Sequence, residues 1–307
     1  MAHGGGNKAI IAALSANLGI AVTKFVAFLL TQSSSMLAES VHSLADSGNQ
    51  LLLLLGGRRA RRAPDEEHPF GYGRERYMYA FIVSIVLFSL GGLFALYEAW
   101  HKFADPHPIE SWHWVPIVVL LAAVGMEGFS FRTAVHEANQ TRGQQSWVQY
   151  IRTAKAPELP VVLLEDSGAL VGLLMALFGV SMTLVTHDGR WDAVGSAGIG
   201  LLLVAIAIVL AVETTSLLLG ESASRTDVDA VRAALVGAGV LSVIHLRTVH
   251  LGPEELLVAA KIEVDAGDTA AGIAGAIDAA EQRVRSAVPI ARVIYLEPDL
   301  RRGAPHP

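Results

Sequence analysis

The chain has 307 residues and no cysteine, which excludes disulfide bonds and thiolate metal sites. Only 17% of its residues are charged and 52% are hydrophobic, whereas soluble domains carry about 25% charged residues. The formal net charge is -6, and charged residues are scarce in long apolar stretches but ordinary in the last third of the chain. This asymmetry predicts a membrane domain followed by a smaller soluble domain.

The first two thirds of the chain contain apolar segments that are long enough for membrane-spanning helices of about 20 residues. Six such segments cover residues 9–31, 36–57, 78–100, 113–131, 160–185 and 193–219. Two long polar connections separate the second segment from the third and the fourth from the fifth. We therefore predict an all-α six-helix transmembrane bundle over residues 1–220.

Basic residues are distributed unevenly between the two sides of this predicted bundle. One side carries only Lys102 and Arg190. The other side carries Lys8, Arg58, Arg59, Arg61, Arg62, Arg74, Arg76, Arg132, Arg142, Arg152 and Lys155. Because basic loops stay in the cytoplasm, this pattern predicts a multi-pass protein of the cell (inner) membrane with both termini in the cytoplasm. The arginine run at 58–62 is interpreted as an orientation signal and lipid contact, not as a nucleic-acid site.

Residues 221–307 have the pattern of a small soluble domain. An amphipathic helix (RTDVDAVRAALVGAG) is followed by two alternating strands, VLSVIHLRTVHLG and ELLVAAKIEVDA, with GPEE as the turn between them. A second helix, capped by Asp268 or Thr269, and a last strand, ARVIYLEPD, complete the order αββαβ. This order predicts an α+β domain with its helices on one face of a sheet, on the cytoplasmic side.

Two of the predicted spans carry ionisable side chains, and such residues are costly inside a bilayer unless they have a partner or a function. In the second span, His42 and Asp46 are four residues apart and share one helix face, which Asn49 continues one turn on. In the fifth span, Glu165 and Asp166 are adjacent. The two spans run in opposite directions, so we expect these groups to meet at a similar depth.

Imidazole nitrogen and carboxylate oxygen, without sulfur, suit Zn²⁺ and also Mn²⁺, Fe²⁺ or Co²⁺. Adjacent helical residues point about 100° apart, so Glu165 and Asp166 can hardly face one ion equally. Of the two, Asp166 is the favoured ligand. Glu165 is left with three roles: a ligand, a hydrogen-bond partner of a ligand, or a contact with a neighbouring helix. The alternative is structural, in which His42 and Asp46 form a buried pair that locks two helices. If metal binds, protons compete for the same groups.

The remaining charges of the predicted spans are interpreted as structural. Lys24 of the first span and Glu39 of the second are expected to neutralise one another. Glu98, Glu127 and Glu213 fall near the ends of their predicted spans, where they can reach water or a basic partner.

Several motifs, taken together, resemble the cation diffusion facilitator family, close to the branch of the animal mitochondrial zinc transporter. They are SSSMLAESVHSLADSGNQ, EEHPFGYGRERY, LLGES and the final VIYLEPD. The resemblance implies a homodimer with ferredoxin-like soluble domains at residues 221–307. It implies export of a divalent metal, foremost Zn²⁺, from the cytoplasm in exchange for protons. His42, Asp46 and Asp166 match the family's ligand positions.

The chain departs from the family's pattern at Val162, four residues before Asp166, where a His or Asp is usual. Glu165, Asn49 or water is then left to complete the metal shell, and Mn²⁺, Fe²⁺ or Co²⁺ become stronger alternatives. The missing ligand also leaves open a non-transporting membrane scaffold or metal sensor of the same fold. No nucleotide loop, nucleophile motif or HExxH is present, so neither an enzyme nor a prosthetic group is expected.

A second metal site is not expected. The connection after the second span carries Asp65 and His68, but Tyr72 stands where some relatives have a further His. The soluble domain is expected to serve mainly in dimerisation.

Overall fold

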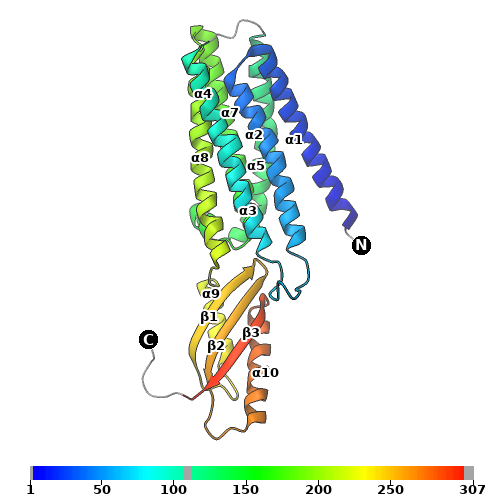
Figure 1. The fold of residues 1–307 in the computed structure, drawn as a ribbon, viewed down its shortest axis with the longest axis vertical. Coiled ribbons are helices and arrows are strands. Elements are labelled where there is room, and N and C mark those ends of the chain that lie inside the picture. The colour runs from blue at the N-terminus through cyan, green and yellow to red at the C-terminus, as the bar shows by residue number, and fades with distance from the viewer. Residues whose placement is uncertain (1–2, 107–111, 301–307) are drawn as a thin grey trace. The chain divides into compact units, whose positions relative to one another are not determined.

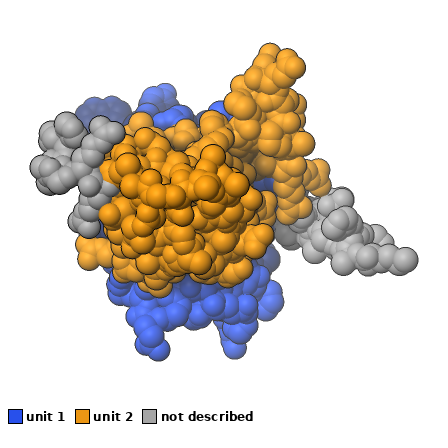
Figure 2. Space-filling view, turned by 90° about the horizontal axis from the view of Figure 1, so that it is seen from below, with its two compact units in different colours: residues 1–57, 78–215 blue, residues 58–77, 216–307 orange. Residues whose placement is uncertain are grey.

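The computed structural model describes residues 3–106 and 112–300, with side chains from Asn17 onward in its first helix. The side chain of Lys8, which contributes to the predicted orientation, lies outside this range. The chain divides into two compact units, coloured in Figure 2: Met1–Gly57 with Met78–Thr215, and Arg58–Tyr77 with Ser216–Pro307. Each unit is described by itself.

The first unit is helical, and its long helices run side by side as a bundle (Figure 1). Its elements are α1 (His3–Thr31), α2 (Ser34–Arg59), α3 (Glu75–Val86), η1 (Leu87–Leu93), α4 (Phe94–Ala104), α5 (Trp114–Arg142), α6 (Trp147–Thr153), α7 (Glu158–Thr186) and α8 (Arg190–Leu219). Buried apolar side chains such as Met36 of α2, Leu120 of α5, Leu173 of α7 and Leu203 of α8 join these helices in one core.

Four helical stretches in the described residues are long and apolar enough to cross a membrane: Glu75–Ala104, Trp114–Arg142, Glu158–Thr186 and Arg190–Leu219. A multi-pass membrane protein is thereby confirmed, while the count of six remains a prediction. The apolar part of α1, Asn17–Thr31, is shorter. Helix α2 is 26 residues long, but its hydropathy is lowered by polar residues, namely the serines, His42, Asp46, Asn49 and Gln50.

The start of α2 is held by a buried acid from α8. The Asp192 carboxylate accepts hydrogen bonds from the Ser33 hydroxyl (2.9 Å) and from the backbone N–H groups of Ser34 (2.7 Å) and Ser35 (3.3 Å). A carboxylate satisfies the free N–H groups of a helix N-terminus and matches its positive dipole. This contact joins α8 to the helix that carries His42 and Asp46.

Two predicted segments differ from the structure. The third span is not one uniform α-helix, because Leu87–Leu93 is a π-helical stretch between α3 and α4. The fourth span was expected to end at residue 131, but α5 continues to Arg142, and the polar connection after it contains the short helix α6. Glu137, Ala138 and Gln140 are good helix formers, so the helix extends beyond the apolar segment.

The second unit has the predicted element order: α9 (Arg225–Leu235), β1 (Ser242–Gly252), β2 (Glu255–Glu263), α10 (Ala270–Ala287) and β3 (Ala291–Asp299). The sheet order is β1-β2-β3, with β1 antiparallel and β3 parallel to β2 (Figure 1). Alternate residues of β2, including Val258 and Ile262, are buried with Val231 of α9 and Val284 of α10. Thr269 caps α10, because its side chain accepts from the Gly272 N–H.

The connection between α2 and α3 packs within this second unit. Arg76, in the first turn of α3, lies 3.6 Å from the Glu254 carboxylate at the β1–β2 turn. A Cβ placed on Gly73 would lie 2.8 Å from the Leu251 carbonyl oxygen and 3.1 Å from the Gly252 Cα. Real Cβ atoms do not approach so closely, so the absence of a side chain at Gly73 permits this contact.

Candidate functional site

The helix α2 brings His42 and Asp46 together, as their spacing predicts. The His42 Nδ1 lies 3.4 Å from the Asp46 Oδ1, and the His42 side chain is 1% exposed. Neither ring nitrogen of His42 has a hydrogen-bond partner among the described residues, nor does Asp46 Oδ1. Buried polar atoms normally have partners, so this imidazole is not accounted for by packing alone.

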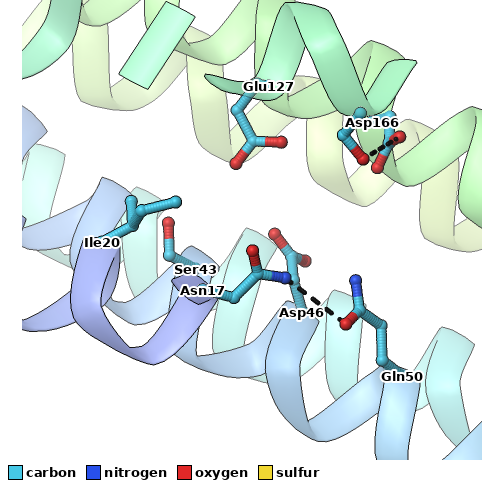
Figure 3. A pocket seen from close by; sticks show the side chains of 8 residues that line it. Asn17, Ile20, Ser43, Asp46, Gln50, Glu127 and Asp166 are labelled. Atoms are coloured by element: carbon cyan, nitrogen blue, oxygen red, sulfur yellow. Dashed lines mark hydrogen bonds between the residues drawn. The ribbon is translucent and has the colours of Figure 1, made fainter. Parts of the chain in front are cut away.

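A small cavity lies beside this pair, between α1, α2, α5 and α7 (Figure 3). Three carboxylates line it: Asp46 from α2, Glu127 from α5 and Asp166 from α7. The other lining residues are neutral: Asn17, Ile20, Ser43, Gln50 and Ser130. The cavity has a volume of about 20 Å³, which is room for roughly one water molecule.

The two acids of α7 point in different directions, as expected for neighbours on a helix. The Ser130 hydroxyl of α5 donates a 2.9 Å hydrogen bond to Asp166, which lines the cavity. The Asn49 side chain of α2 donates a 2.7 Å hydrogen bond to Glu165. Neither Glu165 nor Asn49 lines the cavity. The structure therefore places the five predicted residues in two neighbouring groups. One is His42 and Asp46 with Asp166, and the other is Asn49 with Glu165. Of the five, only Asp46 and Asp166 line the cavity.

The three carboxylates surround the cavity without converging on one point. Among the described residues, no three side chains of His, Cys, Asp or Glu lie close enough together to hold one metal ion. Metal binding by this set requires the side chains to turn towards a common centre.

Glu127 is the site residue that the sequence reasoning missed. It was expected near the end of its span, in contact with water or a basic partner. Instead α5 continues well beyond it, and its side chain points into the cavity opposite Asp46 (Figure 3). The signal available in the sequence was the spacing of Glu127 and Ser130, which places both on one helix face.

The expected neutralisation of Lys24 is confirmed. Its ammonium lies 3.0 Å from Glu39 Oε2, and the two side chains are 1% and 0% exposed. It also donates a 2.8 Å hydrogen bond to the Ser43 hydroxyl, which lines the cavity. Lys24 is therefore bound to Glu39, and among the described residues no ion pair joins it to the three carboxylates of the cavity wall.

In the connection between α2 and α3, Asp65 is occupied by local contacts. The Tyr72 hydroxyl donates a 2.5 Å hydrogen bond to Asp65 Oδ2, and the His68 N–H donates to Oδ1 at 2.8 Å. The bond from Tyr72 lowers the pKa of Asp65, and the same bond raises the pKa of Tyr72. Both oxygens of Asp65 thus already accept hydrogen bonds from residues of the same connection.

In the second unit, His245 of β1 and Lys261 of β2 are opposite one another in the sheet, and each has polar partners. The Arg247 guanidinium donates a 2.8 Å hydrogen bond to the His245 ring. Lys261 lies 3.0 Å from Glu297 and 3.2 Å from Asp299, and these hydrogen bonds, that to Glu297 first, raise its pKa. These contacts tie β2 to β3.

Comparison with known proteins agrees with the membrane helices. Residues 10–219 match the family described as the cation efflux transmembrane domain. Over 264 residues, the chain is 31% identical to the Xenopus laevis protein named "Proton-coupled zinc antiporter SLC30A9, mitochondrial" and 30% identical to its Homo sapiens counterpart. The alignments cover 85% of this chain and 47% and 46% of those relatives.

A further relative is the Arabidopsis thaliana protein named "Metal tolerance protein C4", 28% identical over 83% of this chain and 56% of its own length. The chain thus spans about half the length of the relatives it matches. Two of these names describe antiporters and none describes an enzyme, in agreement with the expectation from the sequence. The similarity to the mitochondrial antiporters also confirms the predicted branch. The chain belongs to the cation efflux family, which is the cation diffusion facilitator family that its motifs resemble.

Proposed function

We propose that this protein carries a divalent metal cation, foremost Zn²⁺, across a membrane in exchange for protons. The observation that carries the proposal is the cavity between membrane helices, with carboxylates on its wall and beside it the imidazole of His42, which lacks a hydrogen-bond partner in the described residues. Acidic side chains inside a membrane domain are stable only with a cation or a proton. A cation that comes and goes is the substrate these groups would serve.

In this proposal, His42, Asp46 and Asp166 bind the metal, with Glu165 and Asn49 supporting them through their own hydrogen bond. Ligands must be deprotonated to bind a metal, so protons and metal exclude one another at the site. Protons that enter from the outer side would displace a cation that entered from the cytoplasm. Lys24, Glu39 and Glu127 are the other charged groups near the site, and they modulate this competition.

The wider architecture is part of the same proposal. Residues 1–220 form six transmembrane helices with both termini in the cytoplasm, in the cell (inner) membrane. Residues 221–307 form a ferredoxin-like cytoplasmic domain that joins two copies as a homodimer. The mixed sheet with its parallel β2–α10–β3 crossover and the buried face beneath α9 and α10 support this assignment.

Metal flux in sealed vesicles tests the proposal. The purified full-length protein is reconstituted in vesicles that contain a Zn²⁺-sensitive dye and are held under a pH gradient. Zn²⁺ should enter when the gradient is imposed, and His42→Ala, Asp46→Asn or Asp166→Asn should abolish the flux. Glu137→Gln, at an exposed acid of the same helix as Glu127, is the matched control and should transport normally.

A second candidate is a metal-binding scaffold that has lost transport, and Val162 favours it because α7 lacks one usual ligand. The scaffold would bind Zn²⁺ but give no flux with any variant or gradient. Flux of Mn²⁺, Fe²⁺ or Co²⁺ in competition with Zn²⁺ decides which metal is the substrate.

A further inference from the structure

Glu127 occupies a position on the cavity wall that the proposed ligands do not explain. It lies near the middle of α5, and its carboxylate points across the cavity towards Asp46 of α2, with Asp166 of α7 beside it (Figure 3). The three acids thus come from three different helices. Ser130, one turn along α5 from Glu127, donates its hydrogen bond to Asp166 and so fixes α5 against α7 at this level.

The charges around the cavity are unbalanced in the described part of the chain. The wall holds three acids and no basic side chain. Lys24, the buried base nearest to this region, is bound to Glu39 and to Ser43. Three carboxylates that share one small cavity in a membrane domain repel one another strongly, whereas a divalent cation between them removes that repulsion.

His42 is an independent sign that the ligand is a metal ion. The side chain is 1% exposed, both ring nitrogens lack a hydrogen-bond partner in the described residues, and the ring faces the Asp46 carboxylate at the cavity. A proton shared between acids would not account for an imidazole whose two nitrogens both lack a hydrogen bond. A metal ion would accept an imidazole nitrogen and carboxylate oxygens in one coordination sphere.

Helix α7 has no second donor one turn before Asp166, where a His or Asp is usual in the family. Val162 lies one turn before Asp166 on α7, and it packs against an apolar cluster that includes Ala134 and Ala138 of α5 and Leu163 of α7. The set of donors is therefore one short. Glu127 lies on the other side of the Ser130–Asp166 contact from Val162, so it would complete the set from a different direction. Glu127 stands on α5, one turn from the residue that contacts Asp166.

We propose that Glu127 is a further ligand of the transported cation and replaces the donor that Val162 lacks. This inference rests on the proposed function. The resulting set of one imidazole and three carboxylates is rich in oxygen, so it accommodates Mn²⁺ and Fe²⁺ as well as Zn²⁺, because harder cations prefer oxygen ligands. Glu127 would thus also determine which metals the site accepts.

Metal titration of the full-length protein in detergent tests this role. Isothermal calorimetry with Zn²⁺ and with Mn²⁺ compares the unmodified protein, Glu127→Gln and the control Glu137→Gln. Glu127→Gln should weaken binding by about 10- to 100-fold, the loss typical for residues that support a metal site, or by more. Mn²⁺ should lose more than Zn²⁺, because an oxygen donor is removed. Glu137→Gln should bind like the unmodified protein.

A rescue variant separates coordination from a structural role. In the double variant Glu127→Gln/Val162→Asp, a carboxylate returns from α7 in place of the one removed from α5. Zn²⁺ binding should recover most of the lost affinity, which a variant that merely repairs packing would not do. Glu127→Asp, which shortens the side chain and keeps its charge, should bind with intermediate affinity and covers the case in which Glu127→Gln does not fold.

The outcomes are distinct. Zn²⁺ and Mn²⁺ affinities unchanged in Glu127→Gln, while Asp46→Asn loses binding, would overturn the role of Glu127 and leave the proposed function standing. If the unmodified protein binds neither metal, the proposed function fails and this inference fails with it. A loss of affinity in Glu127→Gln without recovery in the double variant would also count against direct coordination.

Discussion

Asn49 of α2 donates a 2.7 Å hydrogen bond to Glu165 of α7, the residue immediately before Asp166. Because of this bond Glu165 faces α2 away from the cavity, although it is only 4% exposed. Asp166 receives its hydrogen bond from Ser130 of α5 and lines the cavity. Two adjacent acids are thus given different partners, as the 100° rotation per helical residue requires.

This separation predicts different effects of neutralising the two acids. Glu165→Gln should keep its Zn²⁺ affinity, because the glutamine carbonyl still accepts the hydrogen bond from Asn49. Asp166→Asn should bind Zn²⁺ about 10- to 100-fold more weakly, or worse. Calorimetric titration of both variants in detergent measures the difference. If Glu165→Gln lost as much affinity as Asp166→Asn, both acids would act as ligands and the assignment made here would be wrong.

The soluble domain was predictable from its sequence because its elements are strongly patterned. Alternating apolar residues mark β2, where every second residue is buried, and Thr269 caps α10 as one of the two residues expected to do so. The His42–Asp46 contact was predictable too, since a spacing of four places both side chains on one helix face.

The position of Glu127 was not predictable from apolar length alone. Hydropathy marks the part of a helix that prefers lipid, but α5 runs on through polar helix formers to Arg142, so the expected end at residue 131 was not a real end. Which face of α5 meets α2 and α7 depends on packing between helices that are distant in sequence. In the π-helical stretch Leu87–Leu93, Gly91 and Gly92 likewise lie close to Leu203 and Val204 of α8, residues that are distant in the sequence.

The Lys24–Glu39 ion pair should be essential for stability, because both charges are buried in the membrane domain. Lys24→Met leaves the Glu39 carboxylate without its counter-charge. Removing one partner of a buried pair destabilises proteins by about 3–5 kcal/mol. The thermal midpoint of the purified protein, followed by intrinsic fluorescence in detergent, should therefore fall clearly.

The double variant Lys24→Met/Glu39→Gln is the control for this prediction. It removes both charges, so it should recover much of the stability lost in the single variant. An equal loss in the single and double variants would indicate that the fold needs the lysine for its bond to Ser43 rather than for the charge of Glu39.

The Tyr72–Asp65 hydrogen bond predicts a pH window for the connection between α2 and α3. The pKa of Asp65 is lowered, so its contribution is present above its unfolded pKa of about 3.9 and is lost as the pH falls through the lower folded value. The pKa of Tyr72 is raised, so its contribution is present below about 10 and is lost as the pH rises through the higher folded value. The contact should therefore be intact at neutral pH.

A titration of the Tyr72 ring by NMR measures this contact directly, with Tyr72→Phe to assign the signal. In Asp65→Asn the acceptor loses its charge, so the pKa of Tyr72 should fall towards about 10. Glu66→Gln, at an exposed acid next to Asp65, should leave the titration unchanged. A Tyr72 ring that titrates alike in the unmodified protein, in Asp65→Asn and in Glu66→Gln would contradict the hydrogen bond.

Gly200 permits a close backbone contact between α8 and the π-helical region. A Cβ at this position would lie 2.9 Å from the backbone nitrogen of Leu96 and 3.0 Å from the carbonyl oxygen of Gly92. Backbone atoms cannot yield as a flexible side chain can, so Gly200→Ala should destabilise the membrane domain by about 1–3 kcal/mol, as overpacking does.

Gly19→Ala is the matched control, because nothing lies within 4 Å of its Cβ position, and replacing a helical glycine there should stabilise by about 0.5–1 kcal/mol. Thermal midpoints of the two variants in detergent should therefore move in opposite directions. A midpoint for Gly200→Ala at or above that of the unmodified protein would show that α8 can shift away from Leu96 and Gly92 without loss.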